Sequence, residues 1–219
     1  MFYDTRTGDH GLPHDPFKSC VVPRPIGWIS TLGKENLPNL APYSQFQSLN
    51  FDPPYVMFSA NQTPDGNRKD TTVNTEYSGE FVYNMATCDL REAVNITAEQ
   101  VMPDVDEFDL AGLTKATPNI VRAPRVEESP IQLECFYHHT LRLPGNCTMG
   151  TIDIVIGEVV GIHIKDEVIR SDGKIDIAKI RPLTRLGYYE YSVIDSVFEM
   201  IIPGQDKALL SGLEGKKKQ

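Results

Sequence analysis

The sequence predicts a mainly β protein with helical insertions, folded as an antiparallel barrel or sandwich. Many runs alternate apolar and polar residues or stay apolar over the length of a strand. Only two segments have helical periodicity, and both are modest. The strands also lack the regular helical spacing of a doubly wound parallel sheet. We therefore expect antiparallel connections around one β core.

Length and turn content favour one main domain. The chain has 219 residues, enough to bury a sizeable core, and its 16 Gly and 16 Pro provide for many turns. Residues 1–17 are polar and contain prolines, so we expect an N-terminal arm there. The domain is expected over residues 18–203, with a frayed tail over residues 204–219.

The charge excludes two classes of partner. With 21 basic and 30 acidic residues the net charge is −9, so the protein as a whole repels nucleic acid and anionic membranes. An anionic ligand must then be held by a local cationic site. The first residues lack the apolar core of a secretory signal and no stretch is long enough to span a membrane, so we expect a cytoplasmic protein. The four cysteines form no CxxC pair, and we expect free thiols.

Three strands are expected early in the chain. Residues 23–31 (PRPIGWIST) alternate between two faces, and residues 33–36 supply the turn to a partner strand at residues 39–48 (NLAPYSQFQS). The partner carries polar side chains on both faces, and these need neighbours, water or a ligand. Residues 53–61 (PPYVMFSAN) then form a compact apolar run typical of a buried strand.

The next segment, residues 64–72 (PDGNRKDTT), is the clearest candidate site. Arg68 and Lys69 lie beside hydroxyl side chains, between a Pro-Asp-Gly turn and a short helix that we expect to stop at Gly79. A helix start has free backbone N–H groups, and together with two cations these suit a phosphate dianion. The alternative is a solvated loop that only caps the helix. We expect Asp70 to be the N-cap of the helix or to pair with Arg68.

The following part predicts a strand, a helix and a long excursion. Residues 80–85 (EFVYNM) are expected to return as a strand, and residues 88–101 to form a helix with one apolar stripe. Residues 106–130 contain three prolines and are typical of a loop. We expect this excursion to pack on the surface of the barrel.

Two long strands are the strongest signals in the chain. Residues 131–143 (IQLECFYHHTLRL) place apolar side chains mainly on one face, and residues 151–164 repeat the pattern. Gly157 and Gly161 are positions where a strongly curved strand can bend or bulge. A last ordered piece is expected over residues 182–195.

Five of these segments, in this order, resemble one family. The sequence is similar to the flavin reductase-like proteins of the FMN-binding split-barrel fold, a group that includes the flavoredoxins. Together the segments cover most of residues 20–195. They are PRPIGWIST (23–31), NLAPYSQFQSLNFDPPYVMFS (39–59), RKDT (68–71), SGEFVYN (78–84) and PLTRLGYYEY (182–191).

The resemblance implies a Greek-key, antiparallel split β-barrel that forms a homodimer and binds FMN near the subunit interface. It implies hydride transfer from NADH or NADPH to flavin, with a downstream oxygenase or another electron acceptor. Hydride chemistry belongs to the cofactors, so no catalytic acid or base is assigned. One alternative is a flavoredoxin-like FMN electron carrier without direct NAD(P)H turnover. A further alternative is a noncatalytic β-barrel module whose cationic loop binds some other phosphate.

The resemblance also implies which residues bind the cofactor. The FMN phosphate is expected to be held by Ser59, Arg68, Lys69 and Thr71. The polar edge of the isoalloxazine is expected to meet Ser44, Gln45 and Phe46, and the length of the ring to meet Trp28, Ser30 and Thr31.

Several residues have a second interpretation. Trp28 is as well explained as a core residue. His138 and His139 are adjacent in a strand and point to opposite faces, so we predict no metal site. Residues 144–147 (PGNC) stand where many relatives carry a Gly-Asp-His turn, which leaves no histidine there. Arg185 either supports the ligand mouth or the dimer, or forms a surface salt bridge.

Overall fold

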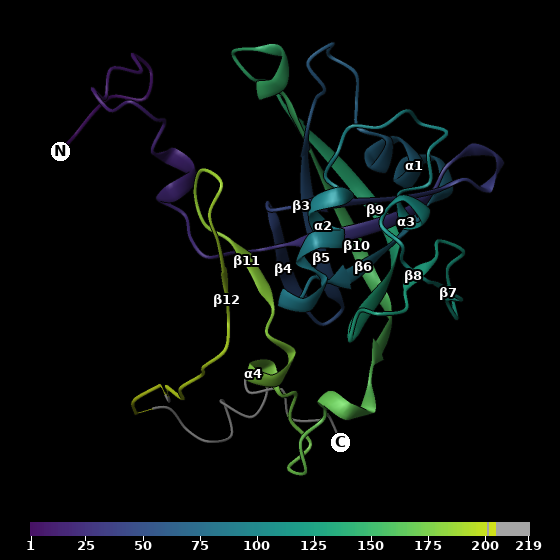
Figure 1. Cartoon of the computed structure of the whole chain (residues 1–219). Coiled ribbons are helices and arrows are strands. Elements are labelled where there is room, and N and C mark those ends of the chain that lie inside the picture. The colour runs from purple at the N-terminus through teal and green to yellow at the C-terminus, as the bar shows by residue number, and fades with distance from the viewer. Residues whose placement is uncertain (201, 205–219) are drawn as a thin grey trace.

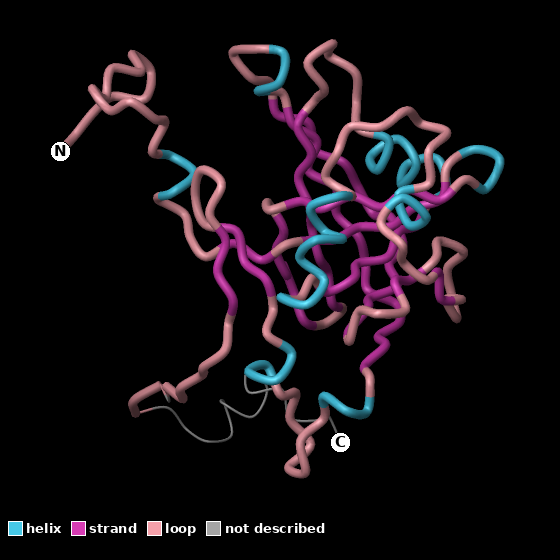
Figure 2. The backbone as a smooth tube through the Cα atoms, viewed as in Figure 1, coloured by secondary structure: helices cyan, strands magenta, loops and turns pink. Residues whose placement is uncertain are grey.

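The alternating segments pair into one seven-stranded antiparallel sheet and two small sheets (Figure 1, Figure 2). The computed structural model describes residues 1–200 and 202–204. The strands are β1 (Arg24–Pro25), β2 (Gly27–Leu32), β3 (Pro38–Tyr43), β4 (Phe46–Phe51), β5 (Pro54–Asn61), β6 (Glu80–Met85), β7 (Lys115–Ala116), β8 (Arg125–Val126), β9 (Ile131–Leu143), β10 (Ile152–Ile164), β11 (Leu183–Arg185) and β12 (Tyr191–Val193). The helices are α1 (Asp70–Ser78), α2 (Arg91–Ile96), α3 (Glu107–Leu110) and α4 (Ile177–Ile180).

The large sheet curls into a barrel because its two edge strands are consecutive in the chain. Its order is β3-β2-β6-β9-β10-β5-β4, so β3 and β4 lie at opposite edges. Only Ser44 and Gln45 separate them, and the N–H of Ser59 in β5 donates to the carbonyl of Gln45 at 2.8 Å. The sheet therefore closes on itself at this link, which confirms the predicted antiparallel barrel.

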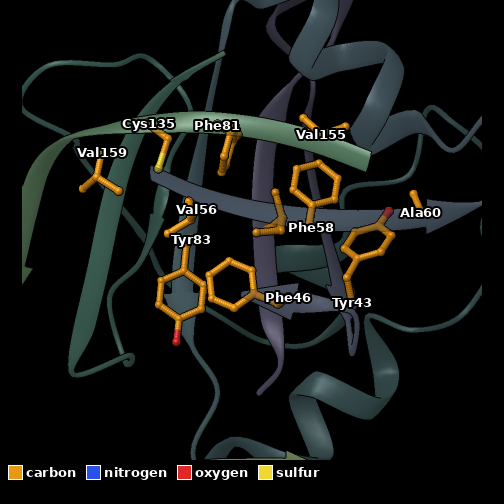
Figure 3. Close-up of a cluster of buried hydrophobic side chains, with 11 residues drawn as sticks. Tyr43, Phe46, Val56, Phe58, Ala60, Phe81, Tyr83, Cys135, Val155 and Val159 are labelled. Atoms are coloured by element: carbon orange, nitrogen blue, oxygen red, sulfur yellow. The ribbon is translucent and has the colours of Figure 1, made fainter. Parts of the chain in front are cut away.

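Aromatic side chains fill the barrel (Figure 3). Phe46 stacks on Tyr83 with ring centroids 4.5 Å apart, and Phe58 meets Phe81 edge to face at 5.5 Å. The packing depends on Gly157, because a Cβ there would lie 2.3 Å from the Phe81 ring. The register of β9 and β10 shifts at Gly157 and again before Gly161, which confirms the predicted bulges.

A second apolar cluster lies outside the barrel, under α2 and α3. Trp28 follows Gly27 in β2 and faces away from Ile29, which is in the barrel core. It packs with Val94 of α2 and Phe108 of α3, is fully buried, and donates its indole N–H to Thr97 Oγ1 at 2.9 Å. The core interpretation of Trp28 is the one that the packing supports.

The excursion over residues 106–130 packs on the barrel, as predicted. Glu134 of β9 is fully buried and accepts the backbone N–H groups of residues 119–121 at 2.6–2.9 Å. Glu80 of β6 accepts both the N–H and the Nε of Arg122. The first half of β9 is therefore buried on both faces, where its alternation predicted one solvent face.

The helices start and stop at slightly different residues from those predicted. The N-cap of α1 is Lys69, and Asp70 lies in the first turn without capping it, so the predicted N-cap is wrong by one residue. Gly79 ends α1 with φ 76°, as predicted. Helix α2 is shorter than the segment 88–101, because a 3₁₀ turn precedes it and turns follow it.

The N-terminal arm contains no strand among residues 1–23 and lies beside the β11–β12 hairpin (Figure 1). The tail predicted over residues 204–219 lies outside the described residues except for Gly204. Among the described helices, none combines the length and the apolar character needed to cross a bilayer.

Candidate functional site

A cavity of about 410 Å³ opens where β3 ends and α1 begins. We call it the α1 cavity. It lies between the β3 edge of the barrel, the loop that enters α1, and the turns after α2. Its lining is formed by residues 39, 41–43, 63–65, 67–71, 97–101, 103 and 107. Of the residues predicted to hold a phosphate, Arg68, Lys69 and Thr71 line it and Ser59 does not.

Lys69 supplies the available positive charge of this cavity. Within the part of the chain that the structure describes, its ammonium group makes no ion pair. Burial lowers the pKa of Lys69, and the neighbouring Asp70 opposes that shift. The N–H groups of Thr72 and Val73 bond the carbonyl of Lys69 at 3.0 and 3.1 Å, so α1 starts at the cavity. An anion bound here would contact both a cationic side chain and the N-terminus of a helix.

Arg68 also lines the cavity, but its guanidinium group is already hydrogen-bonded to two carboxylates. Its two terminal nitrogens donate to Glu76 at 2.7 and 2.6 Å, and its Nε donates to Asp153 of β10 at 2.8 Å. Arg142 of β9 donates to the same Asp153. Burial alone would raise the pKa of Asp153, but these two guanidinium groups hold it below its usual value. Arg68 therefore ties the loop before α1 to the barrel and presents Lys69.

Asn39 and Glu107 are polar residues of the cavity that were not among the predicted site residues. Asn39 donates to the buried hydroxyl of Thr71 at 3.2 Å. Glu107 accepts the N–H of Leu40 at 3.0 Å, and burial raises its pKa despite that bond. Asn39 is the first residue of the NLAPYS segment, so this motif could have indicated it. The same was not possible for Glu107, because it belongs to the excursion, which has no recognisable motif.

The three residues predicted along the isoalloxazine are buried and line neither of the two cavities described in this section. Trp28 is buried under α2, and Ser30 and Thr31 have no exposed surface. Ser30 donates to the carbonyl of Pro124 in the excursion, and Thr31 accepts from Asn74 of α1 at 3.3 Å. Their side chains hold neighbouring elements against β2 and line neither this cavity nor the next one. The reason is that β2 is an inner strand covered on both faces.

The remaining predicted residues surround the link between β3 and β4. Gln45 accepts from Ser59, which is buried, and Phe46 faces the barrel core. Ser44 lines a second cavity of about 680 Å³, which we call the N-terminal cavity. Since Tyr43 lines the α1 cavity, the two cavities adjoin consecutive residues of this link.

The donor set of the α1 cavity fits a phosphate monoester. Lys69, the Thr71 hydroxyl and the start of α1 are the groups that bind a phosphate dianion. Acidic side chains also line the cavity, but burial raises the pKa values of Asp70 and Glu107 and so disfavours their charged forms. In the described residues no group of three or more His, Cys, Asp or Glu side chains could hold a metal ion.

Sequence comparison supports the same family as the motifs. The family model described as "Flavin reductase like domain" matches residues 19–191. An uncharacterized protein of Aquifex aeolicus is 37% identical over 171 residues, which cover 77% of this chain and 84% of that protein.

Solved structures share the architecture. Nitrilotriacetate monooxygenase component B from Bacillus cereus matches with a TM-score of 0.83 and 28% identity, over 91% of this chain and 98% of that chain. Flavoredoxin of Desulfovibrio vulgaris (Miyazaki F) matches with a TM-score of 0.73 over 84% of this chain and 93% of that chain. Its 19% identity shows the fold alone. Taken with the match over residues 19–191, the chain belongs to the flavin reductase-like family and has its split β-barrel fold.

Proposed function

We propose that the protein is an FMN-dependent oxidoreductase of the NAD(P)H:flavin reductase type. The observation that carries this proposal is a cavity with a phosphate donor set, at the closing link of a flavin reductase-like barrel. FMN bound there would supply the hydride chemistry, with NADH or NADPH as the donor that is oxidised to NAD⁺ or NADP⁺ and a separate acceptor for the electrons.

The residues of the chain bind and orient. Lys69, Thr71 and the first N–H groups of α1 hold the FMN phosphate, and Arg68 keeps that loop in place. The segment 41–44 offers backbone groups and the Ser44 hydroxyl to the ring.

A homodimer is part of the proposal. Large apolar side chains are exposed along β4, β9 and β10, and β4 is an edge strand of the sheet. A second copy of the chain that covers this surface would remove it from water. Light scattering during size-exclusion chromatography measures the mass in solution. The exposed side chains are Leu49, Phe51, Phe136, Leu141, Leu143, Ile162 and Ile164.

We also propose a cytoplasmic setting, where reduced nicotinamide is available, and a separate electron acceptor. The Bacillus cereus neighbour is one component of a monooxygenase. An oxygenase that consumes reduced flavin is therefore one class of acceptor for this chain. A second candidate function, compatible with the fold shared with flavoredoxin, is an FMN electron carrier without NAD(P)H turnover.

An anaerobic stopped-flow experiment separates these functions. The purified protein is loaded with FMN and mixed with NADH or with NADPH while the visible flavin band is followed. Bleaching by either nucleotide supports the reductase, and a band that stays oxidised with both supports the carrier. Titration of the protein with FMN tests the common premise, because a phosphate-binding module of another kind would not bind the flavin.

A further inference from the structure

The N-terminal arm lies beside the tip of the β11–β12 hairpin (Figure 1), and residues of both line the N-terminal cavity. Residues 13–15, 17 and 18 supply one wall, and Tyr188 and Tyr189 of the hairpin supply another. Ser44 closes it on the barrel side, one residue beyond the part of β3 that lines the α1 cavity. The two cavities are therefore lined by consecutive residues of the chain, Tyr43 and Ser44.

Two arginines meet in this cavity. Arg24 and Arg185 are directly opposite each other on β1 and β11. Neither makes an ion pair among the described residues. Burial lowers the pKa of Arg24, and the charge of Arg185 lowers it further. Two like charges at paired strand positions repel each other. An anion bound between them would attract both and so offset this repulsion.

The existing partners of these arginines are neutral. Arg24 donates to the carbonyls of Lys18, Val21 and Leu186, while its Nε is buried without a hydrogen-bond partner in the described structure. The Nη2 of Arg24 donates to one carbonyl, so its second N–H is the group of Arg24 that a ligand can reach.

Arg185 is held in the same way. It donates to the carbonyl of Tyr188 and the hydroxyl of Tyr191, and its guanidinium lies 4.5 Å from the centre of the Tyr191 ring. The one carboxylate in the lining, Asp15, accepts the N–H of Phe17 instead. In a chain of net charge −9, this cavity keeps its positive charge uncompensated.

Aromatic rings complete the lining. Phe17 and Tyr189 are 63% and 95% exposed, and Tyr188 meets His14 edge to face at 5.7 Å. Exposed aromatic rings beside guanidinium groups suit a ligand that combines a flat base with phosphates.

We propose that the N-terminal cavity binds the adenosine diphosphate part of the reduced nicotinamide dinucleotide. Arg24 and Arg185 bind the diphosphate, Tyr189 stacks on the adenine, and the nicotinamide passes Ser44 toward the neighbouring cavity. The inference rests on the proposed reductase function and names the binding site of its electron donor.

Isothermal titration of the FMN-loaded protein with ADP tests the inference without turnover. Arg185→Gln should weaken ADP binding about tenfold or more, while Arg185→Lys, which keeps the charge, should retain part of it. Arg170→Gln, which removes an exposed arginine paired with Asp172, is the matched control and should change nothing. The FMN dissociation constant should be the same in all four proteins.

If Arg185→Gln does not fold, a second variant still tests the inference. Tyr189 is almost fully exposed, so Tyr189→Ser should fold normally, and loss of stacking should weaken ADP binding about fivefold or more. Inorganic phosphate, titrated in parallel, should bind far more weakly than ADP.

The inference would be overturned by ADP binding that neither variant changes, by phosphate binding as tight as ADP binding, or by a loss of FMN affinity instead of ADP affinity. Failure of the wild-type protein to bind FMN contradicts the proposed function itself. FMN binding without any ADP binding contradicts this inference alone.

Discussion

The α1 cavity and the N-terminal cavity both contain arginine, but the surroundings give that residue opposite roles. In the α1 cavity, Arg68 is bonded to the carboxylates of Glu76 and Asp153, so its charge is already compensated. In the N-terminal cavity, the hydrogen-bond partners of Arg24 and Arg185 among the described residues are carbonyl oxygens and a phenol. The first arginine fixes the fold around a site, and the other two are available to a ligand.

The comparison shows that the number of cations near a cavity does not measure its attraction for an anion. Arg68 and Lys69 are adjacent in sequence, yet only Lys69 is without a carboxylate bond in the described structure. A cation attracts an anionic ligand when no acidic side chain from a distant strand already forms an ion pair with it. Four changes test this distinction, from the largest expected effect to the smallest.

Removal of Asp153 tests whether Arg68 is structural. The Asp153 side chain is 2% exposed and accepts from both Arg68 and Arg142. Asp153→Ala leaves two guanidinium groups without their shared acceptor, so we expect the free energy of unfolding to fall by roughly 4 kcal/mol. Urea unfolding at neutral pH measures it. Asp172→Ala, which breaks an exposed pair, should cost no more than about 0.5 kcal/mol, and equal losses would contradict the distinction.

Glu134 is a buried acidic residue whose partners, like those of Arg24, are mainly backbone groups. Burial alone would raise its pKa, but the N–H groups of residues 119–121 and the ring of His163 lower it from 4.5 to about 2. Because the folded pKa lies below the unfolded one, the stabilisation is present above about pH 4.5 and is lost as the pH falls toward 2. We expect this loss to be on the order of 3 kcal/mol.

Unfolding measured across this pH range in the wild type and in Glu134→Gln checks that expectation. The variant should be less stable than the wild type at pH 7 and should lose less stability on acidification. Parallel curves for the two proteins would mean that Glu134 is not the group that titrates.

Lys69→Ala should raise the FMN dissociation constant about tenfold to a hundredfold, since a hydrogen bond to a charged group is worth roughly 1.5–3 kcal/mol. Lys174→Ala, which removes an exposed lysine, is the control. Arg68→Ala should weaken FMN binding less and destabilise the fold more, and Arg68→Ala with Lys69→Ala should lose most of the affinity. Flavin titrations that leave the double variant unchanged would place the phosphate elsewhere.

Ser44→Ala probes the residue between the two cavities. The expected effect is the smallest, a loss of about 1 kcal/mol, or about fivefold, in the rate of flavin reduction by the dinucleotide. The dissociation constants for FMN and for ADP should stay near their wild-type values, because the phosphate groups bind elsewhere. A slower rate that follows weaker ADP binding would assign Ser44 to donor binding instead.

Local sequence patterns predicted most of the barrel. The alternation of residues 131–143 and 151–164 gave two long strands, and Gly157 and Gly161 marked their bulges. The stop of α1 at Gly79 also follows from local chemistry, since glycine adopts a positive φ without strain. The order of short motifs led to the flavin reductase-like family, and the basic helix start led to the α1 cavity.

The roles of particular site residues needed the tertiary structure. Arg68 meets Asp153 across 85 positions of the chain, and no local signal indicates that encounter. Trp28, Ser30 and Thr31 lie on a strand that the excursion covers on one face, at Ser30, and α1 covers on the other, at Thr31, so alternation alone could not show that both faces are buried. The sequence by itself determined the strands, the turns and the family, because these depend on interactions between residues close in the chain. Only the tertiary structure decided which charges are compensated, because compensation depends on carboxylates that folding brings from distant strands.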